Sequence, residues 1–504
     1  MMFSDPRRNI KIRHGIIKIP HGIIKIQYEG KRTMKEINIG NRREVFWDNY
    51  LLDEEMTTAQ SRLLPPVEKG ICYTLDQGDE MESVSFLQIL KAEDGYRLYY
   101  CPWSQWKTPI VIRLAVLESK DGIHWTRPHL NLFPHPELRE NNIVIDDLAD
   151  NAFVFLDPNP CCPKEEKYKA ICEQVSVNEE GEHRPSLWCY TSPDGFRFQK
   201  AWLMSENGTF DTLNTVHWRD GKYACYIRDF HGYESETKKW TGVRDIRVMY
   251  STDFKNWTIP KQLEYEDGLD IPMYTNNVIP YERAPHILIG FPTRYMERKC
   301  WTQNNEQFVS SAVKKEVMKL EPRFGLAVTD CVFMHSRDGE FWYRNNEAFL
   351  TPGYETEDNW VYGDCYPAYN LVDSGKETYY MYCHMYDRTQ NKAKDLMRYE
   401  IRKDGFACIM AGGKESLAVT KPLIFTGKEL HLNFSTSACG YIYVDVLDAE
   451  GNPLSEKESF EIYGDNLDRC ISFADDTDFG PYSGKPVRLR FRMYDAKLYS
   501  MWFV

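Results

Sequence analysis

The chain of 504 residues lacks several features that mark common classes of protein. No apolar run reaches the ~20 residues needed to cross a membrane, and the N-terminus has no apolar core typical of a signal peptide. There is no Lys/Arg-rich run, and the formal net charge is −13, which disfavours nucleic acid and anionic membranes as partners. These absences predict a soluble, cytoplasmic protein.

Cysteine is present but not in a pattern that binds metal or forms a disulfide framework. The 14 cysteines are scattered along the chain, and neither a CxxC pair nor a Cys/His zinc spacing occurs. Cys161 and Cys162 are adjacent. Scattered cysteines in a long chain are typical of reduced, buried, apolar side chains. We therefore predict no metal site and no cofactor.

The sequence is instead rich in aromatic residues (14%), which favours strands, and it repeats one short motif. The motif is Ser-x-Asp-Gly-x-x-aromatic, with Phe254 replacing glycine in the third copy and the serine missing from the fifth. The aspartates recur every 59–85 residues, in the segments 119–125, 192–198, 251–257, 336–342 and 402–406. A repeat of this length holds about four strands, so the period predicts five blades of a β-propeller.

Each copy of the motif is predicted to form the last hairpin of its blade. Asp-Gly provides the positive φ of a tight turn, and a preceding Ser or Thr can accept hydrogen bonds from free N–H groups of the turn. Asp-Gly turns occur in many β-proteins, but five copies in one frame favour a repeated blade. Five predicted pairs of strands, each joined by a short turn such as residues 93–95 or 219–221, give the same number of blades.

Three regions follow from these patterns. Residues 1–33 contain a near-perfect duplication of seven residues and form either an added hairpin or, as we predict, a poorly ordered extension. Residues 34–406 are predicted to form the five-bladed propeller. Residues 407–504 alternate apolar and polar side chains with a period of two, which predicts a C-terminal β-sandwich. The fold class is therefore all-β.

Polar residues open the predicted inner strands, whose starts meet at one mouth of the central channel. They are Glu80, Glu82, Asp150, Asn151, Asp211, Asn214, Asn276 and Asp364. Cleavage of a glycosidic bond needs one protonated carboxyl group and one carboxylate as base or nucleophile. The set fits that chemistry, although any single member is as easily a turn cap that binds backbone N–H groups.

Three further residues are candidates for sugar binding or catalysis. Arg228 and Asp229 end the second strand of the third blade, where an Arg beside an Asp can clamp a pair of sugar hydroxyls; an ordinary ion pair is the alternative. Trp103, in a loop of the first blade, can stack on a sugar ring, whereas packing between blades is the alternative role of such an aromatic residue.

The repeated hairpins, the carboxylates at the inner-strand starts and the trailing β-region resemble the five-bladed propeller glycoside hydrolases of families 32, 43 and 68. The resemblance is greater to family 32 N-terminal-domain-like bacterial proteins and covers roughly residues 45–504. It implies that Glu82, or Glu80, is the base or nucleophile, that Asp150 is a modulating carboxylate and that Asp211 is the acid.

The resemblance also matches Arg228-Asp229 to the start of the invertase Arg-Asp-Pro motif and adds Asp229 to the catalytic set. This chain departs from the pattern in three places. Phe230 stands where the motif has proline, and the first blade has no Asn-Asp-Pro-Asn. No Glu-Cys acid motif opens an inner strand, because Cys172-Glu173 has the reverse order and lies on a second strand.

The sequence thus predicts a glycosidase that acts on a small carbohydrate by carboxylate acid/base catalysis. One alternative is a glycoside phosphorylase, for which Arg228, Arg294 and Arg298 are the available phosphate ligands. The other is a propeller that binds carbohydrate without catalysis. The sequence does not predict the oligomeric state.

Overall fold

The protein is described here by a computed structural model that covers residues 17–19, 22–24, 35–104, 111–134, 140–146, 149–177, 183–232, 242–385, 392–454, 458–473 and 478–504. Two short strands, β1 (Ile17–Ile19) and β2 (Gly22–Ile24), pair antiparallel within the duplicated segment. The prediction for the rest of residues 1–33 lies outside the described residues. No helix in the described ranges is both long enough and apolar enough to span a membrane.

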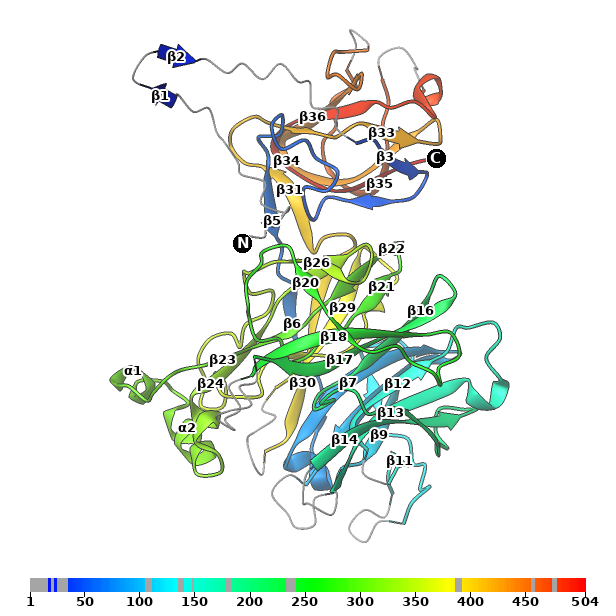
Figure 1. Cartoon of the computed structure of the whole chain (residues 1–504), viewed down its shortest axis with the longest axis vertical. Coiled ribbons are helices and arrows are strands. Elements are labelled where there is room, and N and C mark those ends of the chain that lie inside the picture. The colour runs from blue at the N-terminus through cyan, green and yellow to red at the C-terminus, as the bar shows by residue number, and fades with distance from the viewer. Residues whose placement is uncertain are drawn as a thin grey trace.

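Five sheets, antiparallel except where β20 pairs with β26, form the blades, which confirms the predicted propeller (Figure 1). Blade one holds β7 (Val84–Ala92), β8 (Gly95–Pro102), β9 (Leu114–Ser119), β10 (Trp125–Thr126) and β11 (Ile143–Ile145). Blade two holds β12 (Asp150–Leu156), β13 (Tyr168–Val177), β14 (His183–Ser192) and β15 (Gln199–Ser205). Blade three holds β16 (Thr215–Arg219), β17 (Lys222–His231), β18 (Val243–Ser251) and β19 (Lys261–Gln262).

The last two blades carry additions. Blade four holds β20 (Glu264–Tyr265), β21 (Ile279–Tyr281), β22 (Ala284–Gly290), β25 (Met334–Ser336) and β26 (Phe341–Arg344). A separate hairpin of β23 (Thr293–Glu297) and β24 (Ala327–Cys331) extends it and carries α1 (Gln303–Glu306), α2 (Ser311–Met318) and the 3-10 turn η3 (Pro322–Gly325). Blade five holds β27 (Tyr366–Pro367), β28 (Val372–Asp373), β29 (Thr378–Met385), β30 (Lys394–Arg402) and β6 (Val67–Leu75).

Strand β6 closes the ring. It precedes blade one in the chain, followed only by the 3-10 turn η1 (Gly78–Met81), yet it pairs antiparallel with β30 as the outer strand of blade five. The first and last segments of the propeller are therefore hydrogen-bonded to each other, so the ring cannot open without breaking this ladder.

The repeated motif forms the hairpins that the sequence predicts. In blade one the Ser119 hydroxyl accepts a hydrogen bond from the N–H of Gly122 at 2.9 Å, and the Asp121 carboxylate accepts from the N–H groups of Ile123 and His124. Blades two, three and four repeat this turn around Asp194, Asp253 and Asp338. The aspartates of these copies cap their own turns, so they are not part of a catalytic site.

A tyrosine on the second strand of one blade forms a hydrogen bond with the hairpin of the next blade. Its hydroxyl donates to the carbonyl of the turn glycine in three pairs, Tyr382 to Gly122, Tyr99 to Gly195 and Tyr226 to Gly339. Residue 339 must be glycine, because its φ is +86° and a Cβ there would lie 2.7 Å from the Tyr226 hydroxyl. The motif thus sets both the turn and the contact between blades.

The fifth copy has a different role, because Asp404 is fully buried where the propeller meets the C-terminal sheet. Burial alone would raise the pKa of Asp404, but neighbouring arginines and hydrogen bonds outweigh it and lower that pKa. Its carboxylate accepts hydrogen bonds from Tyr281, Arg283, Ser500, Asn433 and Arg43, at 2.6–3.1 Å. A buried, fully paired carboxylate of this kind connects the two parts of the protein.

A seven-stranded sheet follows the propeller, above it in Figure 1. It contains β31 (Ala407–Ala411), β32 (Ser416–Val419), β34 (Leu430–Leu447), β35 (Asp465–Cys470) and β36 (Arg488–Phe503), together with β4 (Glu44–Val45) and β5 (Gln60–Leu63). Beside it, β3 (Ile37–Gly40) pairs parallel with β33 (Leu423–Phe425). The predicted propeller range of 34–406 therefore includes strands that hydrogen-bond with C-terminal ones. The β-sandwich itself stays a prediction.

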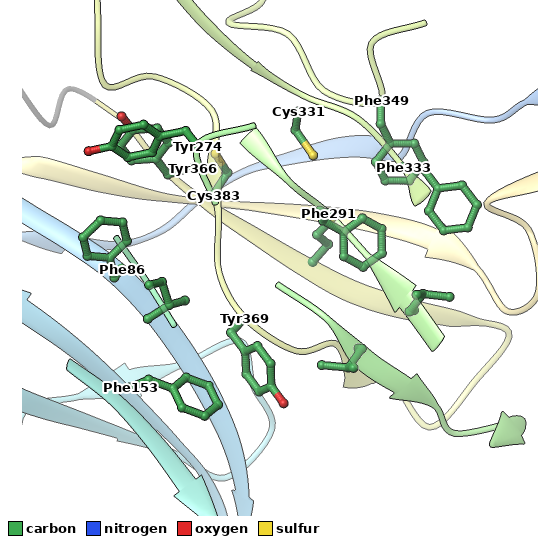
Figure 2. Close-up of a cluster of buried hydrophobic side chains, with 14 of the residues drawn as sticks. Phe86, Phe153, Tyr274, Phe291, Cys331, Phe333, Phe349, Tyr366, Tyr369 and Cys383 are labelled. Atoms are coloured by element: carbon green, nitrogen blue, oxygen red, sulfur yellow. The ribbon is translucent and has the colours of Figure 1, made fainter. Parts of the chain in front are cut away.

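Aromatic side chains fill the centre of the propeller. Figure 2 shows Tyr274 and Tyr366 stacked, with ring centroids 5.5 Å apart, beside Phe86, and a second group around Phe291 and Phe333. These rings come from different blades, so their packing joins the inner strands to one another. Tyr274 also borders the candidate site described next.

Candidate active site

Two carboxyl groups of blade two lie opposite each other. Asp150 opens β12, and its partner across the ladder is Glu173 on β13. The Asn151 side chain donates a hydrogen bond to the Glu173 carboxylate at 2.6 Å. Burial and the neighbouring charge of Asp211 raise the pKa of Asp150 to about 7. Burial, together with the charges of Asp150 and Asp211, raises the pKa of Glu173 well above its usual range. Both carboxyl groups therefore hold a proton more tightly than a free carboxyl group does.

The backbone is irregular where these residues enter the mouth. The register of β12 shifts between Asp150 and Phe153, and Asn151 has a φ of +52°. Phe86, Asn277 and Cys365 have similarly positive φ values at the starts of the inner-strand segments of blades one, four and five. Non-glycine residues rarely adopt this conformation, and bulges of this kind re-aim side chains next to functional sites.

A third carboxylate, Asp211, lies beside a buried arginine. One terminal nitrogen of Arg228 donates to the backbone carbonyl of Asp211 at 2.9 Å, and the other lies 3.8 Å from its exposed carboxylate. The Arg228 guanidinium packs against the rings of Phe230 and Tyr274. Its side chain is fully buried, yet Nε and Nη2 have no hydrogen-bond partner. Such donors are available to a ligand oxygen.

Asp211 also borders a cavity of about 390 Å³ at the same mouth. The other lining residues are Thr209, Phe230, Gly242, Arg244, Glu297 and Arg323. Arg244 lies 4.0 Å over the ring of Tyr295, and its buried Nε also lacks a hydrogen-bond partner. Arg323 donates to the Tyr295 hydroxyl at 3.4 Å. A cavity of this size, lined by several charged side chains beside the ring of Phe230, suits a small polar ligand.

Of the residues predicted from the sequence, Asp150, Asn151, Asp211 and Arg228 come together here. Two other predicted residues, Asn214 and Asn276, hold the surrounding backbone in place. Asn214 accepts a hydrogen bond from the backbone N–H of Arg228 and donates to two carbonyls of its own loop. Asn276 accepts from the Thr215 hydroxyl at 2.6 Å and donates to carbonyls of blade three, so it fastens blade four to blade three.

Two predicted carboxylates are held in ion pairs instead. Glu80 is buried, and both of its oxygens bind the guanidinium of Arg127, at 2.7 and 2.8 Å. Asp229 lies next to Arg228 on β17 and pairs with Arg247 at 3.0 Å, while Thr209 donates to its other oxygen. Neighbouring residues of a strand point to opposite faces, so Asp229 does not share the environment of Arg228.

The remaining predicted residues lie apart from the carboxyl pair or are packed into the blades. Arg294 is bound by both oxygens of Asp330 on the β23–β24 hairpin, at 2.5 and 2.8 Å. Asp364 is fully buried and accepts a hydrogen bond from the N–H of Val361. Trp103 packs against the apolar core between blades one and two. Glu82 is partly buried after η1, and its catalytic role stays a prediction.

Glu173 is the residue that sequence reasoning missed. A regular ladder that pairs Leu156 with Tyr168 would bring residue 150 opposite residue 174. The bulge after Asp150 moves that partner by one residue, to Glu173. Since a shift of one residue reverses which side chains share a face, the bulge decides that Glu173 joins the site.

A larger cavity, of about 670 Å³, lies between the hairpins of blades one and two and is lined by Asp94, Lys120, Asp121 and Asp194 among others. The strands run from the mouth to these turns, so this cavity is at the opposite end of the blades from Asp150. Its aspartates at 121 and 194 are engaged in their own turns, so it does not hold the carboxyl pair.

Comparison with known proteins finds no matching family model and no matching curated protein. Solved structures do align with the chain. An N-acetylgalactosamine deacetylase from F. plautii is 11% identical with a TM-score of 0.45, covering 69% of this chain and 96% of its own. A family 32 β-fructofuranosidase from Bombyx mori is 8% identical with a TM-score of 0.37, covering 88% and 94%.

An α-L-arabinofuranosidase from Fusarium graminearum is 11% identical with a TM-score of 0.35 and covers 68% of this chain and 98% of its own. Several of the other aligned structures are named as glycoside hydrolases or glycosidases. At these identities and TM-scores the likenesses assign no role to any residue of this chain.

Proposed function

We propose that this protein is a glycoside hydrolase that cleaves a small oligosaccharide or glycoside at the mouth between blades two and three. The observation that carries the proposal is the pairing of Asp150 with the buried Glu173 across blade two, beside the exposed carboxylate of Asp211, in surroundings that raise the pKa of both groups. Two carboxyl groups in different environments are the usual requirement for glycosidic cleavage.

Each carboxyl group has a distinct role in the proposed reaction. Glu173 donates its proton to the glycosidic oxygen as that bond breaks, and Asp150 keeps the pKa of Glu173 high. Asp211 is the second carboxylate and either takes a proton from the attacking water or attacks the sugar carbon itself. Glu173 thus takes the acid role that the resemblance implies for Asp211.

The arginines of the mouth support the ligand. Arg228 and Arg244 present unpaired donors next to the rings of Phe230 and Tyr274, and such groups bind sugar hydroxyls. They also favour a second candidate, a glycoside phosphorylase, because guanidinium groups bind phosphate equally well. In that case phosphate replaces water as the attacking group.

The test is an assay of sugar release from nitrophenyl glycosides and natural oligosaccharides, with and without phosphate. We expect turnover that does not depend on phosphate and falls by about 10²–10⁴-fold in Glu173→Gln. Glu118→Gln, on the rim of the cavity at the opposite end, is the matched control. Turnover only with phosphate favours the phosphorylase. Sugar binding without turnover by the wild-type protein contradicts both enzymes and favours a binding propeller.

A further inference from the structure

A second group of chemically active side chains lies far from the mouth, on the edge of the C-terminal sheet. Strands β34 and β35 pair antiparallel there, and His431 is the direct ladder partner of Cys470. Glu429 precedes His431 by two residues, so its side chain points to the same face. One oxygen, one nitrogen and one sulfur atom of these three residues all lie within 4.8 Å of one another.

The separations match those of ligands around one zinc ion. Zinc binds nitrogen and oxygen at about 2.0–2.2 Å and sulfur at about 2.3 Å in a tetrahedron, which places pairs of ligand atoms about 3.3–3.8 Å apart. Nε2 of His431 lies 3.4 Å from Oε2 of Glu429, and Sγ of Cys470 lies 3.8 Å from the same oxygen. Both of these separations fall within the range for two ligands of one ion.

His431 is also oriented as a metal ligand. Its Nδ1 lies 2.5 Å from the carboxylate of Asp468, an arrangement that holds a proton on Nδ1 and leaves the lone pair on Nε2. The imidazole packs against the ring of Trp502, with centroids 5.4 Å apart, so its plane is fixed. A carboxylate behind a histidine is the usual outer support of a zinc site.

The charge of this cluster favours a divalent cation. Glu429 and Asp468 lie 3.4 and 2.5 Å from the two ring nitrogens of His431, so two carboxylates gather at this edge of the sheet. Trp502 is the ladder partner of His431 on the side away from Cys470. The guanidinium of Arg43 lies 3.3 Å over the Trp502 ring, but its ion pair is with Asp404 and not with the cluster. A divalent ion would neutralise the carboxylate and the thiolate that the three ligands bring together.

We propose that Glu429, His431 and Cys470 form a zinc site whose fourth position is open to water. Cys470, on β35, is far in the sequence from Glu429 and His431, which is why no zinc spacing appears there and why the sequence predicts no metal. Because β35 is the outermost strand of its sheet, the ion would fasten this edge to β34. The site is distinct from the propeller mouth and does not depend on the proposed glycosidase activity.

The test uses the full chain freed of metal by a chelator, then titrated with zinc in a calorimeter and with cobalt in a spectrophotometer. We expect one zinc ion per chain and a thiolate-to-cobalt charge-transfer band. Cys470→Ser should abolish the band and weaken zinc binding by at least about 10-fold, and Asp468→Asn should weaken it by about 10–100-fold through the histidine.

Cys439→Ser is the matched control. Like Cys470, Cys439 is an exposed cysteine, but it lies on β34 outside the cluster. Zinc should also raise the melting temperature of the wild-type protein and of Cys439→Ser, but not that of Cys470→Ser. No binding of zinc, or the same affinity in Cys470→Ser as in Cys439→Ser, would overturn the proposal. Cys470 and Asp468 are both exposed on the edge strand β35, so their substitution should leave the fold intact, which circular dichroism verifies.

Discussion

Replacing Asp150 by Asn should stabilise the protein, and the gain should grow with pH. In the unfolded chain an aspartate loses its proton near pH ~4, whereas in the folded protein the pKa of Asp150 is raised to about 7. Between those two values the folded state binds more protons than the unfolded state, so wild-type stability falls as the pH rises. Asn does not titrate and escapes this loss.

The magnitude follows from the two pKa values. The cost of the raised pKa is about 1.5 kcal/mol at a pH of about 5 and about 4.2 kcal/mol at about 8.5, so the advantage of Asp150→Asn should grow by about 2.7 kcal/mol over that interval. Any constant effect of the amide cancels in this difference. Glu173, which loses a charged neighbour, adds to the gain at high pH.

Urea unfolding of both proteins at several pH values gives the free energies to compare. Asp194→Asn is the control, because hydrogen bonds within its turn outweigh partial burial and lower the pKa of Asp194. That carboxylate is ionised in both states above a pH of about 5, so the effect of its replacement should stay constant. A difference between Asp150→Asn and wild type that is also constant would refute the buried, proton-retaining pair.

Three further outcomes are expected. Glu80→Gln should cost about 3–5 kcal/mol of unfolding free energy in urea, because it leaves a buried guanidinium without its charged partner, whereas a cost under about 1 kcal/mol would contradict a structural role. Asp404→Asn should cost a similar amount and separate the unfolding of the propeller from that of the C-terminal sheet in a calorimeter; a single unchanged transition would argue against the buried joint. In a profile of kcat against pH, the alkaline limb should move to lower pH in Asp150→Asn, because burial and the charge of Asp150 raise the pKa of Glu173 and the variant lacks that charge; an unmoved limb would exclude coupling between the two carboxyl groups.

The propeller could be predicted because its signal is local and repeated. Each Ser-x-Asp-Gly turn is specified by residues within seven positions, and the count of turns gives the count of blades. The pairing of β6 with β30 and of β5 with β31 could not be predicted, since a strand carries no local mark of a partner more than 300 residues away.

The site was predictable in part for the same reason. The rule that inner strands start at the channel mouth identifies Asp150 and Asp211, and the Arg-Asp pair identifies Arg228. Glu173 depends on a bulge in the ladder, and Arg244 depends on how blades three and four pack, so neither follows from spacing. Glu80 shows the opposite limit, because a carboxylate next to a strand start can be taken by a buried arginine from a distant loop.

The most direct test of the central claim is the release of sugar by wild type, Glu173→Gln and Asp211→Asn in buffer without phosphate, with Glu118→Gln as the control. The account predicts turnover by the wild type and the control, and loss of at least about 10²-fold in each of the other two variants, with all four proteins folded. Full activity in Glu173→Gln would contradict the account, because the buried pair of blade two would then not supply the proton.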